Sequence, residues 1–524
     1  MAEFSLVNRD PELGGYSPEG LPTHEEYSNY IRRWKFLINS YMGGVEYRQG
    51  NYLTKYHYES SGEYASRLSQ TPMDNHVKSC IHIYNSFLYR NEPKRDFGSL
   101  DGPEMEQFLQ DCDMEGRTWS SFMRDVNVLS SVYGHVAVLI DRPESQAGTK
   151  AEELQQGIRP YATIYTPENI LDWDWERLDS GHYQLRYVRF LEQDDRSYSR
   201  SPTYYIRTWT RDEIHLESYK PGKKNPIELI TTRPNPLGKV PVTWVYANRG
   251  PIRGIGVSDV GDIADMQNHI YNMYSEAEAL IRITNHPTLV KTRETEASAG
   301  AGAIVTMPAE LDGALKPYLL QPSGQNLEAI LKTIDEEVKA IDRMAHLGSI
   351  RAIETRQMSG VAMQSEFILL DSKLCEKAKN LQLAEEQMFR DWGLWQGTPF
   401  DGQIKYPMAF HIRDKNLDMD ILKKAAEAQR DSATATPNVK SIIDQKMMEL
   451  LAKDEDEMEE MQNQMADQGL EHDPVTGAGD LVTHLREMIE QGYSNEEILT
   501  LHPELSTLFK GNNGDISGQD GNTQ

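Results

Sequence analysis

Two pairs of closely spaced aspartates are the first candidates for chemistry in this sequence. Asp172 and Asp174 alternate with tryptophans in "LDWDW", and Asp418 and Asp420 have the same spacing. Two carboxylates held together could bind a divalent cation or act as general acid and base. The chain has 81 acidic residues, however, so such pairs arise readily by chance. We therefore expect packing or surface positions at these sites rather than catalysis.

Histidine and cysteine, the soft metal ligands, lie close together at one place in the sequence. His76 and Cys80 lie four residues apart, on one face of a predicted helix, and His82 follows them. A zinc site needs a fourth partner, and the sequence offers none, so ordinary helix residues are the better interpretation. The glycine-rich run "ASAGAGA" lacks the Lys-Ser or Lys-Thr of a phosphate-binding loop. We expect no metal, no cofactor and no nucleotide site.

Residues 483–502 predict a hairpin of two short helices. Gly492 closes the first helix, and Ser494 with Glu497 forms a capping box for the second. A helix-turn-helix could have this form. The second helix carries Glu496 and Glu497 but no basic residue, whereas reading DNA requires cations that neutralise phosphates. The hairpin is more typical of a protein contact.

Composition sets the general class. Lys and Arg total 54 against 81 acidic residues, a formal charge of -27, which repels nucleic acid on average. The three cysteines are far apart in sequence and form no CxxC pair, which favours a reducing compartment over a disulfide framework. The N-terminus has no basic start with an apolar run, and no segment approaches the roughly 18 to 20 apolar residues of a membrane span. We expect a soluble globular protein that is neither secreted nor membrane-embedded.

Two kinds of periodicity organise the first half of the chain. Residues 24–140 contain apolar side chains at helical spacing, with glycine or proline behind each run. From residue 135 to residue 248 the pattern changes to short β-branched and aromatic segments separated by turn residues. These segments predict strands of a mixed sheet. The fold class is therefore α+β.

Two long helices are expected next. Apolar residues recur every three or four positions through 256–284, and Pro287 stops that helix. Residues 285–323 carry three short strand-like pieces. The second helix, 324–347, has a coiled-coil-like seam suited to packing against another long helix, formed by Leu327, Leu331, Ile334, Val338 and Ile341.

A polar stretch separates this helix from a third one. Residues 348–358 are short and Arg-flanked, and Ser359 with Gly360 begins a helix that runs to about residue 396, with Ser359 as its N-cap. A further strand, "IKYPMAFHI", precedes a helical region at 417–466. Residues 510–524 have no apolar anchor and are expected to be disordered.

Several stretches follow one another in a distinctive order: "YRQGNYLTKYHYESSGEYASRL", "DNHVKSCIHIYNSFLYRNEP", "SSVYGHVAVLID", "YTPENILDW", "LGKVPVTWVYANRG" leading into "DVGDIADMQNHIYNMYSEAE", and "MSGVA". In this order they resemble the portal proteins of tailed bacteriophages. The resemblance covers roughly residues 25 to 412. Each stretch is loose by itself, and their collinearity carries the resemblance.

The resemblance implies an architecture in named parts. Residues 1–255 would be the α+β wing, followed by stem helix 1 at 256–284, the clip at 285–323 and stem helix 2 at 324–347. The tunnel loop would be 348–358, the long wing helix and its returning strand 359–416, the helical crown 417–509 and the disordered tail 510–524. The residues implied to line the DNA channel are Ser349, Ile350, Arg351, Glu354, Thr355, Arg356, Gln357 and Met358.

The resemblance also implies a function without catalysis. Similar proteins form a ring, usually a dodecamer, at one capsid vertex of the virion, after assembly in the host cytoplasm. Double-stranded DNA passes through the channel during packaging and ejection. The large terminase subunit and head-tail adaptors dock on the ring, which also meets the major capsid protein and can meet scaffolding protein. No membrane is involved.

Two other functions stay open from the sequence. One is a phage-encoded metal-dependent nuclease that uses the acidic pairs, and the other is a structural protein that binds DNA through 483–502. Within the portal interpretation, Arg351 and Arg356 are the cations of the tunnel loop, and Glu354 between them would weaken a permanent grip on phosphates. The loop is then expected to make brief contacts with moving DNA.

Overall fold

The computed structural model describes residues 21–144, 149, 152–153, 156–194, 203–220, 227–285, 288–290, 318–320, 324–348, 360–408 and 410. The chain divides into two compact units, Met1–His411 and Ile412–Gln524, and every described element belongs to the first. The predicted crown at 417–509 and the predicted tail at 510–524 lie outside the described residues.

The N-terminal part of the first unit is helical, as its periodicity predicts. Local signals set the helix ends: the Ser60 hydroxyl accepts from the backbone N–H of Glu63 in a capping box, and the Thr118 hydroxyl accepts from Ser121 N–H. The elements are α1 (Glu25–Met42), α2 (Gly44–Gln49), α3 (Ser61–Gln70), α4 (His76–Leu88), β1 (Lys94–Asp96), the 3-10 turn η1 (Gly98–Leu100), α5 (Pro103–Gln110) and α6 (Trp119–Tyr133).

A three-stranded antiparallel sheet forms the centre of this unit. Its strands are β2 (His135–Asp141), β3 (Tyr161–Tyr165) and β9 (Val242–Tyr246), in the order β3-β2-β9. Every residue of β2 is buried, which explains its continuous apolar run "VAVLI" after His135. Helix α6 packs against β2, and the long helix α11 (Gly360–Gln396) packs against β9 and β2.

A second sheet contains five strands in sequence order. They are β4 (Ile170–Arg177), which follows the 3-10 turn η2 (Pro167–Asn169), β5 (Tyr183–Asp194), β6 (Thr203–Thr210), β7 (Glu213–Tyr219) and β8 (Ile227–Pro234). The prediction of one mixed sheet is wrong, because these strands and those of the central sheet form two separate, wholly antiparallel sheets. Short links between successive strands allow hairpins, whereas parallel neighbours would need long crossovers. The α+β class itself is confirmed.

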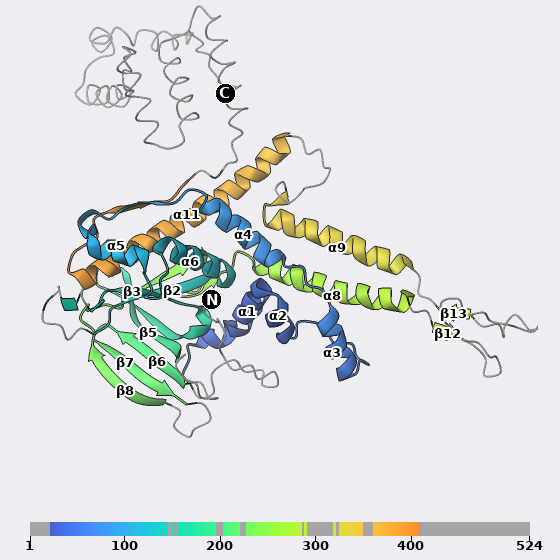
Figure 1. Cartoon of the computed structure of the whole chain (residues 1–524), viewed down its shortest axis with the longest axis horizontal. Helices are drawn as coiled ribbons and strands as arrows, with labels where there is room; N and C mark the ends of the chain where they lie inside the picture. The colour runs from blue at the N-terminus through green and yellow to red at the C-terminus, as the bar shows by residue number, and fades with distance from the viewer. Residues whose placement is uncertain are drawn as a thin grey trace, which may run out of the picture. The chain divides into compact units, whose positions relative to one another are not determined.

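A pair of long antiparallel helices follows the sheets. Helix α8 (Gly261–Asn285) and helix α9 (Gly324–Met344) lie side by side, yellow-green and yellow in Figure 1. Strands β12 (Thr288–Val290) and β13 (Tyr318–Leu320) pair antiparallel just beyond the end of α8 and just before the start of α9. We call α8, α9 and this two-stranded ladder the helical hairpin.

Two further short strand pairs complete the described sheets. Strand β10 (Asn248–Arg249) pairs with β11 (Gly256–Val257), and β1 pairs with β14 (Gln403–Lys405). Gly134 ends α6 with a φ of 96°, and a Cβ there would lie 2.5 Å from the carbonyl oxygen of Gly256. Only glycine permits this backbone conformation and this approach, so the start of β2 and the entry to α8 are held together.

Candidate functional site

The residues that the portal resemblance assigns to the tunnel loop are not among those the structure describes. Ser349, Ile350, Arg351, Glu354, Thr355, Arg356, Gln357, Met358 and the predicted N-cap Ser359 lie outside the described residues, as do Asp418, Asp420 and the hairpin at 483–502. Gly360 is the first residue of α11. The site can therefore be built from the elements on either side of the loop.

The aspartates of "LDWDW" lie on β4 and are engaged by the neighbouring strand. The Tyr187 hydroxyl donates to Asp172 Oδ2 over 3.0 Å, and Arg186 Nη1 lies 3.4 Å from Asp174 Oδ2. Burial, followed by the Asp172 carboxylate, raises the pKa of Tyr187 to about 12. Each carboxylate thus contacts a side chain of the neighbouring strand β5.

The candidate soft ligands on α4 have separate surroundings. His76 and Cys80 are buried, His76 Nε2 lies 3.2 Å from an Asp74 carboxylate oxygen, and His82 Nε2 lies 3.3 Å from the Tyr41 hydroxyl. Across the part of the chain that the structure describes, no three His, Cys, Asp or Glu side chains are grouped so that they could hold a metal ion.

One row of apolar side chains on α9 faces the rest of its own chain. Ile334 and Ile341 are buried, while Leu327 and Val338 are half-buried. Leu331, placed in the same seam by its spacing, is 48% exposed, and Ile330 packs against the core instead. A straight helix turns 100° per residue, so a strict four-three spacing does not stay on one line. Leu331 therefore lies beside the α8 to α9 seam of its own chain.

One polar contact sets the register between the two helices. His269 Nδ1 on α8 lies 2.6 Å from Glu337 Oε1 on α9, and Glu337 is largely shielded while His269 is exposed. Because the helices are antiparallel, equal steps in opposite directions from this pair reach the same level. Ser275 on α8 is thus level with Leu331 on α9, six residues from His269 and Glu337 respectively.

Buried charges hold the entry to α8. Lys377 Nζ on α11 lies 2.5 Å from Asp259 Oδ2, and the Asn248 amide donates to Asp259 Oδ1 over 2.9 Å. Burial acts to raise the pKa of Asp259, but the ammonium groups of Lys377 and Lys373 hold it below its usual range. Burial lowers the pKa of Lys373. The pair fixes α11 to the segment that opens the hairpin.

The exit from α9 is held by α4. The Tyr84 hydroxyl donates to the carbonyl oxygen of Ala345, the residue after α9, over 2.7 Å in a buried position. Lys373 lies over the same tyrosine ring, 4.6 Å from its centroid. The exit of α9 is thus tied to the same helix, α11, that holds the entry of α8. We call Asp259, Lys377, Lys373, Tyr84 and the carbonyl of Ala345 the hairpin root.

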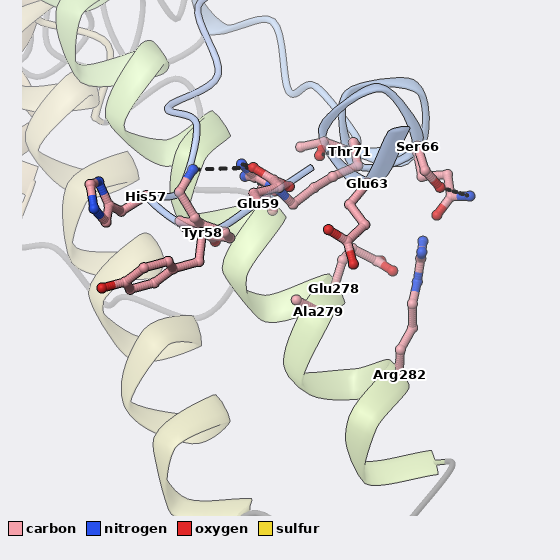
Figure 2. A pocket seen from close by; sticks show the side chains of 13 residues that line it. His57, Tyr58, Glu59, Glu63, Ser66, Thr71, Glu278, Ala279 and Arg282 are labelled. Atoms are coloured by element: carbon pink, nitrogen blue, oxygen red, sulfur yellow. Dashed lines mark hydrogen bonds and ion pairs between the residues drawn. The ribbon is translucent and has the colours of Figure 1, made fainter. Parts of the chain in front are cut away.

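A cavity of about 610 Å³ opens against the outer half of α8 (Figure 2). Its lining comes from α8, from α3 and from the loop before α3. The lining residues are Tyr56, His57, Tyr58, Glu59, Glu63, Ser66, Arg67, Gln70, Thr71, Ser275, Glu278, Ala279 and Arg282. We call it the α3–α8 pocket.

Arg67 holds the walls of this pocket together. Its guanidinium contacts both carboxylate oxygens of Glu59 at 2.8 Å, donates to Ser275 Oγ over 2.9 Å and donates to the carbonyl oxygen of Thr54 over 2.6 Å. It also stacks over Tyr56, 4.0 Å from the ring centroid. The shielded Arg67 side chain thus joins the loop, α3 and α8, and so fixes the walls of the pocket relative to one another.

Tyr58 stands at the mouth of the pocket. It is 95% exposed, and its ring packs edge-on against His57 with centroids 4.7 Å apart. Large aromatic side chains seldom lie so open in an isolated subunit, and they are enriched as anchors in protein interfaces. Tyr58 and the pocket behind it form the described surface best suited to a partner.

The sequence contained a signal for this pocket that periodicity does not capture. Five tyrosines occur between positions 47 and 64, in the stretch "YRQGNYLTKYHYESSGEY", and Arg67 follows one turn later. Such aromatic density close to arginine is typical of binding surfaces. The partner of Arg67 on α8, Ser275, is 208 residues away along the chain. No local sequence pattern reveals a contact over that separation.

Within the described part of the chain, no helix combines the length and apolar character needed to cross a membrane.

The comparisons with known proteins find likeness to solved structures alone. No family model matches the chain, and no curated protein matches it either. One chain of a solved structure described as "Virion of native gene transfer agent (GTA) particle" is similar over 78% of this chain and 98% of its own length. The sequence identity is 8% and the TM-score is 0.39.

Proposed function

We propose that this chain is the subunit of a phage portal, a ring at one capsid vertex through which double-stranded DNA enters and leaves the virion. The observation that carries the proposal is the helical hairpin. Its two helices join an α+β body at one end and a two-stranded ladder at the other. It occurs in the sequence order that the portal resemblance implies.

The hairpin has the properties of an element that packs with copies of itself. Helix α9 buries Ile334 and Ile341 against its own chain but leaves Leu331 half in solvent. Beside α8, the α3–α8 pocket and Tyr58, in the loop before α3, lie uncovered as well. Two different open surfaces on one rod suit head-to-tail contacts, which close into a ring when the rotation between subunits closes.

The charge balance is compatible with a conduit. A formal charge of -27 disfavours dense phosphate contacts, whose strength grows with every cation and would hold DNA that must slide. In this proposal the chain performs no catalysis, and a separate motor supplies the energy. The proposed partners are further copies of the chain, which meet through the hairpin flanks, and then the large terminase subunit, a head-tail adaptor, the major capsid protein and scaffolding protein.

Native mass spectrometry and negative-stain microscopy of the purified full-length chain test the proposal directly. We expect a single large oligomer, dodecameric by resemblance, with a central hole wide enough for duplex DNA. Assembly should be followed across protein concentration and ionic strength, because charged subunits repel one another at low salt. A monomer or dimer under all these conditions at micromolar concentration would overturn the proposal.

A further inference from the structure

Three exposed arginines gather around two tyrosines on the surface of the described unit. Arg177 is the last residue of β4, Arg249 is the last residue of β10, and Arg253 lies between β10 and β11. Tyr183 begins β5 and is 52% exposed, and Tyr246 ends β9. All three arginines are exposed. We call these five residues the arginine patch.

Tyr183 brings two of the cations together. The guanidinium carbon of Arg253 lies 3.3 Å from the centroid of the Tyr183 ring, and that of Arg177 lies 5.8 Å from it. A guanidinium that stacks on an aromatic ring keeps its N–H groups free to donate in its own plane. Tyr183 thus holds two sets of hydrogen-bond donors close together at the surface.

A second set of contacts fixes the loop that carries Arg253. The Tyr246 hydroxyl accepts from the backbone N–H of Gly254 over 3.2 Å, and Trp244 Nε1 donates to the carbonyl oxygen of Gly254 over 3.1 Å. Arg249 lies over the Tyr246 ring, 5.4 Å from its centroid. Burial raises the pKa of Tyr246, whereas the charges of Arg249 and Arg253 act to lower it. Both guanidinium groups therefore lie near one tyrosine, which joins Arg249 to the other two cations.

The arginines of the patch lack the anionic partners that neighbouring arginines have. Arg186 Nη1 lies 3.4 Å from Asp174 Oδ2, and Arg211 Nη1 lies 3.1 Å from Glu176 Oε1. Among the described residues, no aspartate or glutamate forms an ion pair with an arginine of the patch, and this includes Asp179 in the turn between β4 and β5. In a chain with a formal charge of -27, three unmatched cations on one exposed surface favour an anion from outside the subunit.

The patch fits the phosphate groups of a nucleic acid backbone. The planar fork of donors on arginine matches phosphate oxygens in pairs, and such contacts form on DNA whatever the base sequence. Neighbouring cations need several anions at short spacing, and each DNA strand supplies one phosphate per about 3.4 Å of helix axis. The acidic remainder of the chain repels DNA on average, so the contact would be restricted to the patch.

We propose that the arginine patch binds the phosphate backbone of double-stranded DNA. The inference rests on the proposed function, in which DNA is the polyanion that passes each subunit. It adds a contact on the α+β body to the one expected at residues 348–358. Three phosphate contacts give a slope of about -2.7 in log K against log salt, so the affinity should fall roughly 40-fold between about 50 and 200 mM salt. Such a contact is brief enough to let DNA move.

A salt titration of the full-length protein tests the contact. Anisotropy of a short labelled DNA duplex gives the affinity at each salt concentration. Combining Arg177→Gln, Arg249→Gln and Arg253→Gln should reduce the salt slope by about three, because each lost phosphate contact removes about one. The matched control combines Arg90→Gln, Lys332→Gln and Lys379→Gln, which remove the same charge at exposed positions outside the patch. Thermal unfolding checks that both variants are folded.

A photoreactive side chain identifies what lies against the patch. Tyr183 is replaced with p-benzoylphenylalanine in the full-length chain, and the protein is irradiated together with duplex DNA. We expect a covalent product between protein and DNA. The same replacement at Tyr58, an exposed tyrosine of the α3–α8 pocket, is the control and should give far less of this product.

The outcomes separate this inference from the proposed function. A wild-type chain that never forms a ring overturns the proposed function and the inference that rests on it. A wild-type ring whose salt slope is the same with and without the three arginines overturns the DNA contact alone. Crosslinking from position 183 to a second copy instead of DNA also overturns it and assigns the patch to a contact between copies. A crosslink to DNA together with the lost slope supports the proposal.

Discussion

Lys377 and Asp259 form a nearly dry ion pair, with Nζ 2.5 Å from Oδ2 and side chains only 6% and 3% exposed. They come from α11 and from the segment that opens α8, 118 residues apart in sequence. Two buried charges of opposite sign tolerate each other only as a pair, because removal of one leaves the other without compensation in a medium of low dielectric. The pair is therefore a sensitive point of the fold.

Replacing one partner should cost far more than replacing both. We expect Asp259→Ala to lower the free energy of unfolding by about 3 to 5 kcal/mol, since the Lys377 ammonium is left buried and unpaired. Asp259→Ala with Lys377→Met should recover a large part of that loss. Chemical denaturation of the four proteins of the double-mutant cycle measures this coupling. Equal losses in the single and double variants would contradict it.

The two faces of α9 should respond differently to truncation. Ile341→Ala removes a side chain with 0% exposure and should lower the free energy of unfolding by about 2 to 4 kcal/mol. Leu331→Ala removes a half-exposed one and should change it by about 0.5 kcal/mol or less in dissociated protein. Thermal or urea unfolding below the assembly concentration makes the comparison. A large loss for Leu331→Ala in the monomer would show that it supports its own chain.

Acid should destabilise the body through His135. This residue is buried at the start of β2, its Nδ1 accepts from Gly256 N–H over 3.2 Å, and burial lowers its pKa to about 3. The His135 ring gains a proton near pH 6.5 in the unfolded chain but only near pH 3 in the folded chain. Neutral His135 therefore contributes its full stability to the fold above pH 6.5, and this stability is lost as the pH falls towards 3.

The expected slope for this one group is about 1.4 kcal/mol per pH unit between those limits. His135→Asn keeps an acceptor near the Gly256 N–H and has no titrating ring. Its unfolding free energy should be lower at pH 7 but should fall less steeply between pH 6.5 and 4. Denaturant titrations at several pH values give both slopes, and parallel curves for the two proteins would exclude His135 as the cause.

The predicted tunnel loop gives a test of the portal proposal that does not depend on the hairpin. Arg351→Ala with Arg356→Ala should leave ring assembly unchanged and alter the packaging or retention of DNA, because removing cations that meet phosphates weakens a brief grip. Native mass spectrometry checks assembly, and the length of protected DNA in filled heads checks retention. Lys332→Ala with Lys379→Ala removes the same charge elsewhere. Normal filling and retention in the arginine variant would rule out the role assigned to this loop.

Elements with strong local signals were predictable. The first long helix was expected at 256–284 and spans Gly261–Asn285, the second was expected at 324–347 and spans Gly324–Met344, and α11 ends at Gln396, as expected. In each case glycine or proline sits next to a helical repeat. Repeat and breaker are local properties, so one sequence suffices to find them.

Contacts between distant segments were not predictable. Strand β1 was missed because it has three residues and pairs only with β14, more than 300 positions further along. The Arg67 to Ser275 and Lys377 to Asp259 contacts join elements that nothing in either local pattern relates. Leu331 was predicted in the α9 seam because sequence spacing gives the direction of a side chain around the helix only to within one residue. In the structure the neighbouring Ile330 packs against the core at that position.

The hydrogen bond from Tyr84 to the carbonyl oxygen of Ala345 allows the hairpin root to resist force along the hairpin. A pull along α9 would load that hydrogen bond, and through Lys373 and Lys377 on α11 it would load the dry Asp259 pair at the neighbouring end of α8. Both helices of the hairpin are thus held at the same end, whereas the outer turns of α8 are only partly buried and Arg282 is exposed. Force on the helical hairpin should therefore bend its outer half before it separates the residues of the hairpin root.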